Sequence, residues 1–570
     1  MYGGAGFPQG SYVNKVSRCL IVSGLALLIS EPSVAQNIGS IPGAIQNTAI
    51  ETAEFYQRQQ RLNKQRDEQE RFDETLVESG QSHRAPENSN SDQLISVSGI
   101  IVDASAILSA EEVEAVTKKY EHQDLLMSDL SKMLDEINAL YRQHQVITAR
   151  ALLPPQKVQG GVIRVQLVEA RLDEVIFRNR QSTRAQYIAK RIDATPGELA
   201  DVHRLEQDLL VFNGVNDVKL RAILQPGSKP ETTSYLIDVY EPKNIVATVF
   251  ADNTGRDSIG KERLGLNFIN LSLTGNRDRL TLGGSYAEGT DAAYMAYNVP
   301  LNTQGTRMIV GYNYSKIAII SSDLETFNIT GRSTIGSLHV SHPIRITGQS
   351  SVFGVLGINV KESETVFDKV DRFKSSVRSY SLAGEFQGLS QAYQWYASPQ
   401  LNVGIDRFGG DESFTLINGE LGGVLNLADK HEVRLRFRGQ LSDTDLLPSS
   451  EQFQLGGAAS VRGYPEGFLI GDQGYFSSVE YRFSMIDFNG SKGSNSRLDS
   501  IVFVDHGGIY TSASGEALDR EDYLTSVGIG FLYRYADKLQ INVLVGFPLD
   551  DKSNLDDDYA VHFVVGVTPF

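Results

Sequence analysis

The segment EVRLRFRGQL, residues 432–441, alternates between charged or polar side chains and apolar ones. Successive side chains of a β-strand point to opposite faces of a sheet, so this pattern predicts a strand with one apolar and one charged face. Such a strand can contact oil on one side and water on the other. The apolar face would carry Val433, Leu435, Phe437 and Leu441, and the other face Glu432, Arg434, Arg436, Arg438 and Gln440.

The same period of two continues from residue 244 to residue 570 and predicts one large all-β domain. Short turns such as TGNRD and YADK alternate loosely with longer loops. An even number of antiparallel strands of about ten residues, connected in this way, is typical of an outer-membrane barrel. The sixteen expected strands begin near Ile245, Leu264, Asp278, Ala292, Thr306, Phe327, Gln349, Phe373, Tyr393, Ser413, His431, Gly474, Leu498, Tyr523, Leu539 and Tyr559.

A soluble all-β domain is the alternative, because alternation does not say which face lies inside. The last segment, VHFVVGVTPF, ends on the aromatic Phe570, as the last strand of bacterial outer-membrane barrels commonly does. This ending favours the membrane barrel, although Phe570 does not share the face of Val561, Val565 and Val567.

The N-terminal residues have the order of a secretory signal. Lys15 and Arg18 precede the apolar run CLIVSGLALLIS, and the small-residue stretch EPSVAQ follows. We expect a signal peptide at residues 1–35, with cleavage after Ala35. A membrane anchor is disfavoured because the apolar run of about a dozen residues is shorter than the roughly 20 that a spanning helix needs. Cys19 is the single cysteine, so a disulfide framework and a cysteine-based zinc site are excluded.

Residues 36–76 are expected to contain one helix. The stretch NTAIETAEFYQRQQRLNKQRDEQERFDETL, residues 47–76, is rich in helix-forming residues and interleaves acids with bases. Its few apolar residues form no continuous stripe, so the helix must be solvated, coiled or housed in a polar channel. Residues 77–93, VESGQSHRAPENSNSDQ, have the composition of a flexible linker.

Residues 94–170 and 171–243 are expected to form two successive small β-α-α-β-β modules. In the first, a strand over residues 95–102 precedes two helices, and Leu130, Leu134, Ile137 and Tyr141 share the spacing of one buried helix face. The second repeats this order, with helices expected at residues 184–192 and 199–212. The chain therefore combines a tandem of α/β modules with a barrel.

Several function classes have no support in the sequence. The net charge of −17 argues against a nucleic-acid surface. GRDSIGKE, residues 255–262, starts like a phosphate-binding loop, but Glu262 replaces the magnesium-binding Ser or Thr and a strand follows in place of a helix, so a turn is expected. Asp505 and His506 are neighbours on an expected strand and point to opposite faces, which disfavours a catalytic pair. We therefore expect no enzyme activity, no cofactor and no metal site.

Two short motifs remain: SVRGYPEG at residues 460–467, within the long loop 442–473, and FVDHG at residues 503–507. The loop is expected to be too polar and too rich in glycine to contain a strand or a helix. If Val502 and Val504 face lipid, then Phe503, Asp505 and Gly507 face the lumen. Arg462 could belong to an enzyme loop, an anion site or a structural latch, and a solvated loop arginine is the plain alternative.

These motifs resemble the V-R-G-F/Y and F-x-D-x-G elements of the Omp85 superfamily, and the whole chain resembles a TpsB transporter of two-partner secretion. The stretch ITARALLPPQKVQGGVIRVQLVEARLDEV, residues 147–175, is similar to the family's connection between two POTRA domains, and ADNTG at residues 251–255 to its first strand. RQHQVITAR lacks the Gly-Tyr often found there, and Ala170 replaces a usual glycine.

The resemblance implies a 16-stranded antiparallel transmembrane β-barrel of residues 244–570, preceded by an N-terminal plug helix and two POTRA domains. It implies that residues 442–473 are loop 6, which folds into the barrel so that Arg462 contacts Asp505 on the wall. The motif residues it marks are Val461, Arg462, Gly463, Tyr464, Phe503, Asp505 and Gly507.

The implied function is export of one large unfolded exoprotein of the β-helical TpsA type, an adhesin, cytolysin or toxin, without nucleotide hydrolysis. The implied location is the outer membrane of a Gram-negative bacterium, with POTRA domains in the periplasm. Other implied partners are outer-membrane lipid and the barrel-assembly machinery for the chain's own insertion, and no nucleic acid. An Omp85-type factor that inserts other barrels is the alternative, disfavoured because such factors usually carry more POTRA domains and no polar plug helix. A hydrolase on a barrel scaffold is a third hypothesis.

Overall fold

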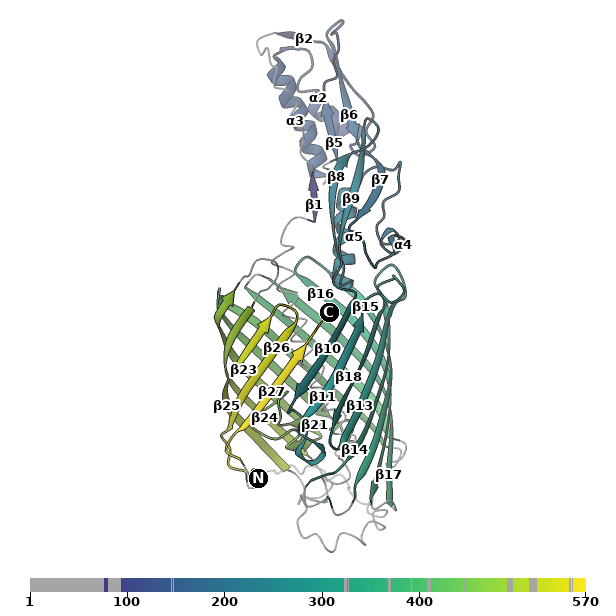
Figure 1. Ribbon diagram of the computed structural model, residues 1–570. Helices are drawn as coiled ribbons and strands as arrows, with labels where there is room; N and C mark the ends of the chain where they lie inside the picture. Colours follow the sequence, from purple (N-terminus) through teal and green to yellow (C-terminus); the bar gives the residue numbers. More distant parts are fainter. Residues whose placement is uncertain are drawn as a thin grey trace, which may run out of the picture.

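The computed structural model describes residues 76–79 and 94–569, apart from gaps at residues 145, 147, 322–324, 326–327, 368–370, 391, 407–411, 445–446, 489–495, 512–519, 553–554 and 556. Figure 1 shows a closed β-barrel with two small α/β modules stacked beyond one end of it. The expected signal peptide, almost all of the expected helix at 47–76, most of the expected linker and Phe570 lie outside the described residues.

The barrel closes with sixteen strands in chain order, each antiparallel to the next. Each strand begins within about three residues of its expected start, and strands such as the 19-residue β17 are longer than expected. The first and last strands pair from Val249 opposite Val567 to Asp252 opposite Val564. The strands are β10 (Ile245–Asp252), β11 (Arg263–Asn270), β12 (Arg279–Ala287), β13 (Thr290–Pro300), β14 (Arg307–Ala318), β15 (Thr330–Ile346), β16 (Ser350–Phe367), β17 (Asp371–Leu389), β18 (Tyr393–Asp406), β19 (Glu412–Ala428), β20 (His431–Ser442), β23 (Gln473–Phe488), β24 (Ser496–Thr511), β25 (Arg520–Tyr535), β26 (Leu539–Pro548) and β27 (Ala560–Val567).

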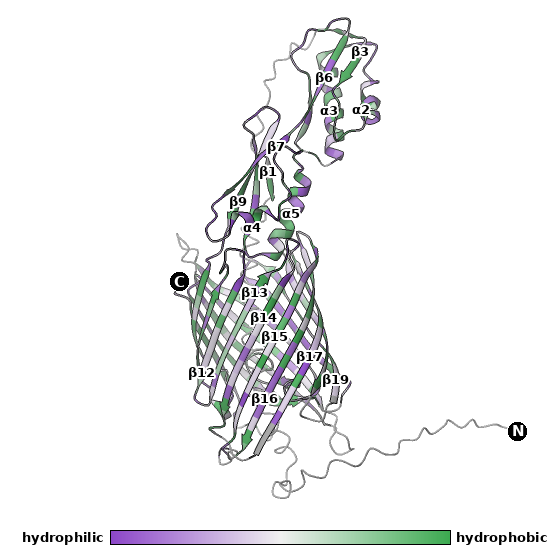
Figure 2. Cartoon of the chain, turned by 90° about the vertical axis from the view of Figure 1, so that its right-hand side faces the viewer, coloured by the Kyte–Doolittle hydropathy of each residue, from purple (hydrophilic) through white to green (hydrophobic). Residues whose placement is uncertain are grey.

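The apolar faces of the strands point outward. In β20, Leu435 is 53% exposed and Leu441 63%, whereas Arg434 is 7% exposed on the opposite face. Hydrophilic and hydrophobic stretches interleave along β13 to β16 in Figure 2. A soluble barrel would bury its apolar faces, so this arrangement is that of a barrel surrounded by lipid.

The first module has a three-stranded sheet in the order β3 (Gly99–Val102), β6 (Val162–Glu169) and β5 (Ala149–Leu152). Helices α2 (Ala110–Thr117) and α3 (Met127–Gln143) belong to the same unit, with β4 (Gln123–Leu125) between them. The strand expected at 95–102 is two strands, because β2 (Ile95–Val97) pairs with β4 and not with the sheet. The buried face of α3 contains Met133, which was not expected, while Leu134 is only half-buried.

The second module has the expected β-α-α-β-β order of β7 (Arg171–Arg178), α4 (Ala185–Ala189), α5 (Val202–Val215), β8 (Lys219–Pro226) and β9 (Thr232–Tyr240). Helix α5 begins three residues later than expected because Asp201 caps it, accepting a hydrogen bond from the backbone N–H of Arg204 at 2.9 Å. Core residues such as Leu209 and Ile237 are fully buried between helix and sheet.

One part of the expected linker is ordered. β1 (Val77–Ser79) pairs in parallel with β8 at the edge of the second module, giving the sheet order β1-β8-β9-β7. The expectation of a flexible chain at 77–79 was therefore wrong. The edge of β8 offers unpaired backbone groups, and pairing with β1 satisfies them.

The long loop between β20 and β23 also differs from its expectation. It contains two short paired strands, β21 (Phe453–Leu455) and β22 (Leu469–Gly471). Its side chains form a core with the inner barrel wall, made of Phe453, Leu455, Val461, Tyr464, Leu469, Phe476, Ile509 and Leu524. The loop is thus packed inside the barrel and is not a solvated excursion.

Among the described residues, no helix is both long enough and apolar enough to cross a membrane.

Candidate functional site

Arg462 lies at the tip of the packed loop and contacts the inner wall at β24. Its Nε donates to Asp505 Oδ2 at 2.7 Å and its Nη2 to Asp505 Oδ1 at 2.8 Å, which is a bidentate pair. The backbone N–H of Arg462 also donates to Asp505 Oδ2 at 3.1 Å. Asp505 is fully buried, so three donors from one residue hold its carboxylate away from bulk water.

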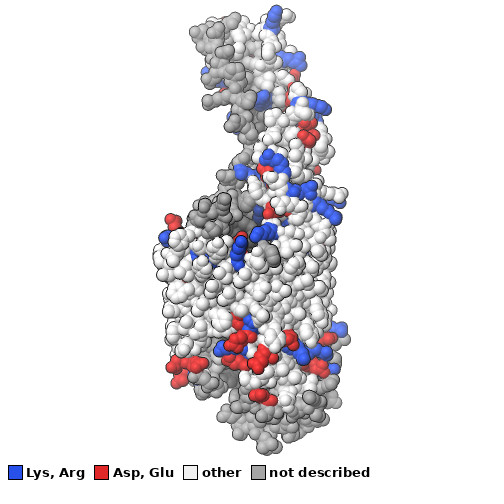
Figure 3. All heavy atoms as spheres, viewed as in Figure 1, with Lys and Arg blue, Asp and Glu red and all other residues white. Residues whose placement is uncertain are grey.

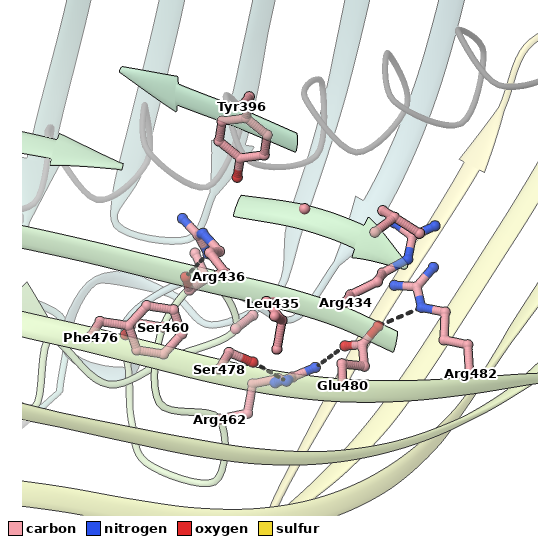
Figure 4. A pocket seen from close by; sticks show the side chains of 14 residues that line it. Tyr396, Arg434, Leu435, Arg436, Ser460, Arg462, Phe476, Ser478, Glu480 and Arg482 are labelled. Atoms are coloured by element: carbon pink, nitrogen blue, oxygen red, sulfur yellow. Dashed lines mark hydrogen bonds and ion pairs between the residues drawn. The ribbon is translucent and has the colours of Figure 1, made fainter. Parts of the chain in front are cut away.

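Three further wall residues complete the arginine's surroundings, and the sequence motifs marked only one of them. Nη1 of Arg462 donates to Glu480 Oε2 at 2.8 Å, and Nη2 to Ser478 Oγ at 3.2 Å. The guanidinium carbon lies 3.5 Å from the centre of the Phe503 ring. Figure 4 shows Arg462, Ser478 and Glu480 side by side, with Arg482 on the far side of Glu480.

Glycines let the loop tip approach the wall. Gly463 has φ of 103°, a left-handed conformation that favours glycine. Gly546 on β26 faces it so closely that a Cβ there would lie 2.5 Å from the backbone nitrogen of Gly463 and 2.7 Å from the carbonyl carbon of Arg462. The pairing of Gly463 with Gly546 joins positions far apart in the chain, and no sequence motif marked Gly546.

The remaining motif residues pack around this contact. Val461 and Tyr464 are fully buried. The Tyr464 hydroxyl donates to the carbonyl oxygen of Thr525 at 3.0 Å. At Gly507 a Cβ would lie 2.9 Å from Leu455 in β21, so this glycine makes room for the loop.

The charged face of β20 holds the backbone of the same loop. Nη1 of Arg436 donates to the carbonyl oxygen of Ala459 at 2.6 Å, Nη2 of Arg438 to that of Gln454 at 3.0 Å, and Nε2 of Gln440 to that of Glu451 at 2.7 Å. The alternation that opened the sequence analysis therefore supplies two functions, an outer face for lipid and an inner face that binds the loop.

A cavity of about 50 Å³ lies beneath the loop tip, bounded by Arg434, Arg436, Arg462, Arg482 and Glu480 among other residues. A space of this size has room for about one or two water molecules. Each named arginine contacts a carboxylate or a loop carbonyl, and the lining holds no nucleophile next to a base. The chemistry that the site supports is that of a structural lock.

The two decoy motifs have structural roles. Residues 255–262 form the expected turn between β10 and β11, with a short 3₁₀ helix at Asp257–Ile259. Nη2 of Arg256 in this turn donates to Gln454 Oε1 of the loop at 2.9 Å. His506 points away from Asp505, and its ring nitrogens contact the Tyr475 hydroxyl at 2.9 Å and Thr525 Oγ1 at 3.1 Å.

Residues 233–533 match the family model described as haemolysin secretion/activation protein ShlB/FhaC/HecB, which covers more than half of the 570-residue chain. The chain belongs to this family. Residues 95–170 match a ShlB-type POTRA domain. The protein is thus a TpsB-type transporter of two-partner secretion, located in the outer membrane with its POTRA modules in the periplasm. The family consists of secretion channels and is not a known class of enzyme.

Relatives and solved structures agree with this assignment. The chain is 25% identical over 476 residues to the heme/hemopexin transporter protein HuxB of Haemophilus influenzae, covering 79% of this chain and 82% of that protein. It is 22% identical over 490 residues to the outer membrane transporter CdiB of Dickeya dadantii, covering 80% and 83%.

The fold is similar to that of CdiB from Escherichia coli, with a TM-score of 0.66 and 18% identity over 92% of this chain and 99% of that chain. It is also similar to BamA from Haemophilus ducreyi lacking POTRA domains 1–3, with a TM-score of 0.52 and 13% identity over 84% and 100%. The loop between β20 and β23, residues 442–473, is called loop 6 from here on.

Proposed function

We propose that the contact of Arg462 with Asp505 and Glu480 is a latch that holds loop 6 inside the barrel and that secretion depends on it. The supporting observation is the number of directed bonds at one side chain. Arg462 makes four side-chain hydrogen bonds and one backbone bond to three wall residues. A lysine cannot reproduce this fork of donors, so position more than charge is at stake.

The cargo of this transporter is a secreted exoprotein of the TpsA type, and its capture in the periplasm would use open sheet edges. β3 and β5 are the edges of the first POTRA sheet, and β7 is the edge of the second that β1 does not cover. An extended, unfolded segment can add a strand to such an edge through backbone hydrogen bonds. Capture of an unfolded β-helical exoprotein by strand addition is therefore part of the proposal.

The remaining assignments rest on the sequence. The proposed order is a signal peptide at 1–35, a plug helix region at 36–76, a linker at 77–93 shortened by β1, POTRA domains at 94–170 and 171–243, and the barrel with loop 6. The plug helix would occupy the lumen at rest. Transport would proceed without nucleotide hydrolysis or other enzyme activity, and the barrel-assembly machinery would insert the chain.

The test is secretion of the cognate exoprotein by cells that produce Arg462→Ala at normal outer-membrane levels. We expect a sharp loss of secreted exoprotein, with a barrel that still shows heat-modifiable migration in electrophoresis. Arg332→Ala is the matched control, because Arg332 also pairs with a carboxylate, Glu364 at 3.2 Å, but is 62% exposed on β15. Full secretion by Arg462→Ala, or an equal loss in the Arg332 control, would reject the latch.

A further inference from the structure

The second POTRA module is fastened to three periplasmic turns of the barrel. Arg277, buried in the turn between β11 and β12, donates Nε to Asp217 Oδ1 at 3.0 Å and a second bond to Asp217 Oδ2. The backbone N–H of Arg184 donates to the carbonyl oxygen of Gly275 at 2.8 Å in the same turn. A Cβ at Gly214 would touch the Ile346 side chain at the third turn. These contacts fix the height of α4 above the barrel end.

Exposed basic side chains surround this junction. They are Arg180, Arg184 and Lys190 next to α4, and Arg345 near the periplasmic end of β15, and we call these four residues the basic rim. Arg345 pairs with Val352 of β16, where Leu356 and Ile358, which have the same parity, are exposed to the outside. Figures 1 and 2 both place α4 directly beyond the rim of the barrel, and Figure 3 shows basic side chains gathered at this junction.

Apolar side chains at the same turns mark the edge of the lipid phase. Leu273, Leu301 and Ile344 are 50%, 53% and 68% exposed on the three turns. Arg184 bonds to the turn of Leu273, and Nη2 of the neighbouring Arg191 donates to the carbonyl oxygen of Asn302 at 2.8 Å, one residue from Leu301. The basic rim therefore lies where apolar side chains give way to polar ones, which is the depth of lipid headgroups.

Nearby carboxylates are engaged with other groups. Glu241 accepts hydrogen bonds from the backbone N–H groups of Gln181, Ser182 and Thr183. Asp278 is buried and bonded to Thr274 and Tyr297. The cations of the basic rim are therefore not neutralised by these two acids.

The opposite end of the barrel carries the reverse charge. The segment LDDKSNLDDDY at residues 549–559 contains five aspartates, and Figure 3 shows acidic side chains along that end. In a chain with net charge −17, a basic cluster confined to the periplasmic junction is a local feature. Its position and sign fit negatively charged headgroups of the inner leaflet.

We propose that the basic rim binds the phosphate groups of anionic phospholipids, such as phosphatidylglycerol, in the periplasmic leaflet of the outer membrane. The bound headgroups would lie between the barrel wall and the second POTRA module. Because that module is fastened to the turns, the lipid would stabilise its orientation over the pore.

The experiment uses the full chain in nanodiscs of equal parts phosphatidylglycerol and phosphatidylethanolamine, with retained lipids counted by native mass spectrometry. The wild type is expected to retain phosphatidylglycerol in excess. Each neutralised basic-rim residue lowers that excess about fivefold at physiological salt, since one cation near a membrane surface contributes on the order of 1 kcal/mol. The test variants are the single substitutions and the combined variant Arg180→Gln, Arg184→Gln, Lys190→Gln and Arg345→Gln.

The matched control removes four exposed cations from the first POTRA module by Lys118→Gln, Lys119→Gln, Lys132→Gln and Arg164→Gln, whose side chains are 60% to 69% exposed. It changes the net charge equally and is expected to keep the wild-type lipid ratio. No preference in the wild type, an unchanged ratio in the combined variant, or an equal loss in the control would overturn the proposal. Normal electrophoretic heat-modifiability of each variant establishes that its barrel is folded.

Discussion

Gly546→Ala tests the latch from the side of the wall that no motif marks. The new Cβ would lie 2.5 Å from the backbone nitrogen of Gly463, while Cβ atoms essentially never approach closer than 3.0 Å, so the loop tip must move by at least about 0.5 Å. The obstacle is backbone on both sides, and no flexible side chain can yield. The same shift would lengthen the 3.1 Å bond from Arg462 N–H to Asp505 beyond normal hydrogen-bond range.

The expected cost of this overpacking is about 1 to 3 kcal/mol, concentrated at the loop tip. Secretion by Gly546→Ala should therefore fall toward the level of Arg462→Ala while the barrel still inserts. Gly566→Ala on β27 is the control, because its Cβ would meet only the Thr248 methyl group at 3.7 Å, an ordinary contact. Wild-type secretion by Gly546→Ala at equal barrel levels would refute the reasoning.

Three other predictions concern the periplasmic parts and the pore. Burial opposes ionisation of Glu241, but hydrogen bonds from Ser182, Gln181 and Thr183 outweigh it and lower its pKa to about 2. The stability it gives the module junction is present above about pH 4.5 and is lost as the pH falls toward 2, so amide exchange at 181–183, corrected for intrinsic rates, should accelerate over that interval. Glu241→Gln should show fast exchange already at neutral pH, and no difference from wild type there would contradict the assignment. Deletion of residues 47–76 should raise single-channel conductance in planar bilayers, and unchanged conductance counts against a lumenal plug. Removal of residues 94–240 should abolish binding of the exoprotein's N-terminal region in a pull-down; retained binding would place capture elsewhere.

Local periodicity was sufficient to predict the barrel. Alternation has a period of two over hundreds of residues, so even the strand starts were predicted closely. The inward direction of Asp505 followed from the same parity. Failures occurred where tertiary contacts override local composition. Loop 6 is polar and rich in glycine, yet β21 and β22 pair in it because the barrel wall supplies a packing surface.

Long-range partners were the part that the sequence could not provide. Glu480 was one acid among 70, and nothing in its neighbourhood distinguished it before Arg462 was placed beside it. Gly546 and the strand β1 are similar cases, because each acquires its role from a segment more than 80 residues away. The arginines of β20 were visible as a charged face, but their bonds to loop carbonyls depended on the loop's path.

The most direct test of the latch is a double-mutant cycle on secretion with Arg462→Ala, Asp505→Ala and the combined variant, each at matched outer-membrane levels. If the two residues act through their mutual contact, the combined variant should secrete no less than the more defective single variant. Independent roles would give losses that multiply in the combined variant. Multiplied losses, or full secretion by either single variant, would contradict the account.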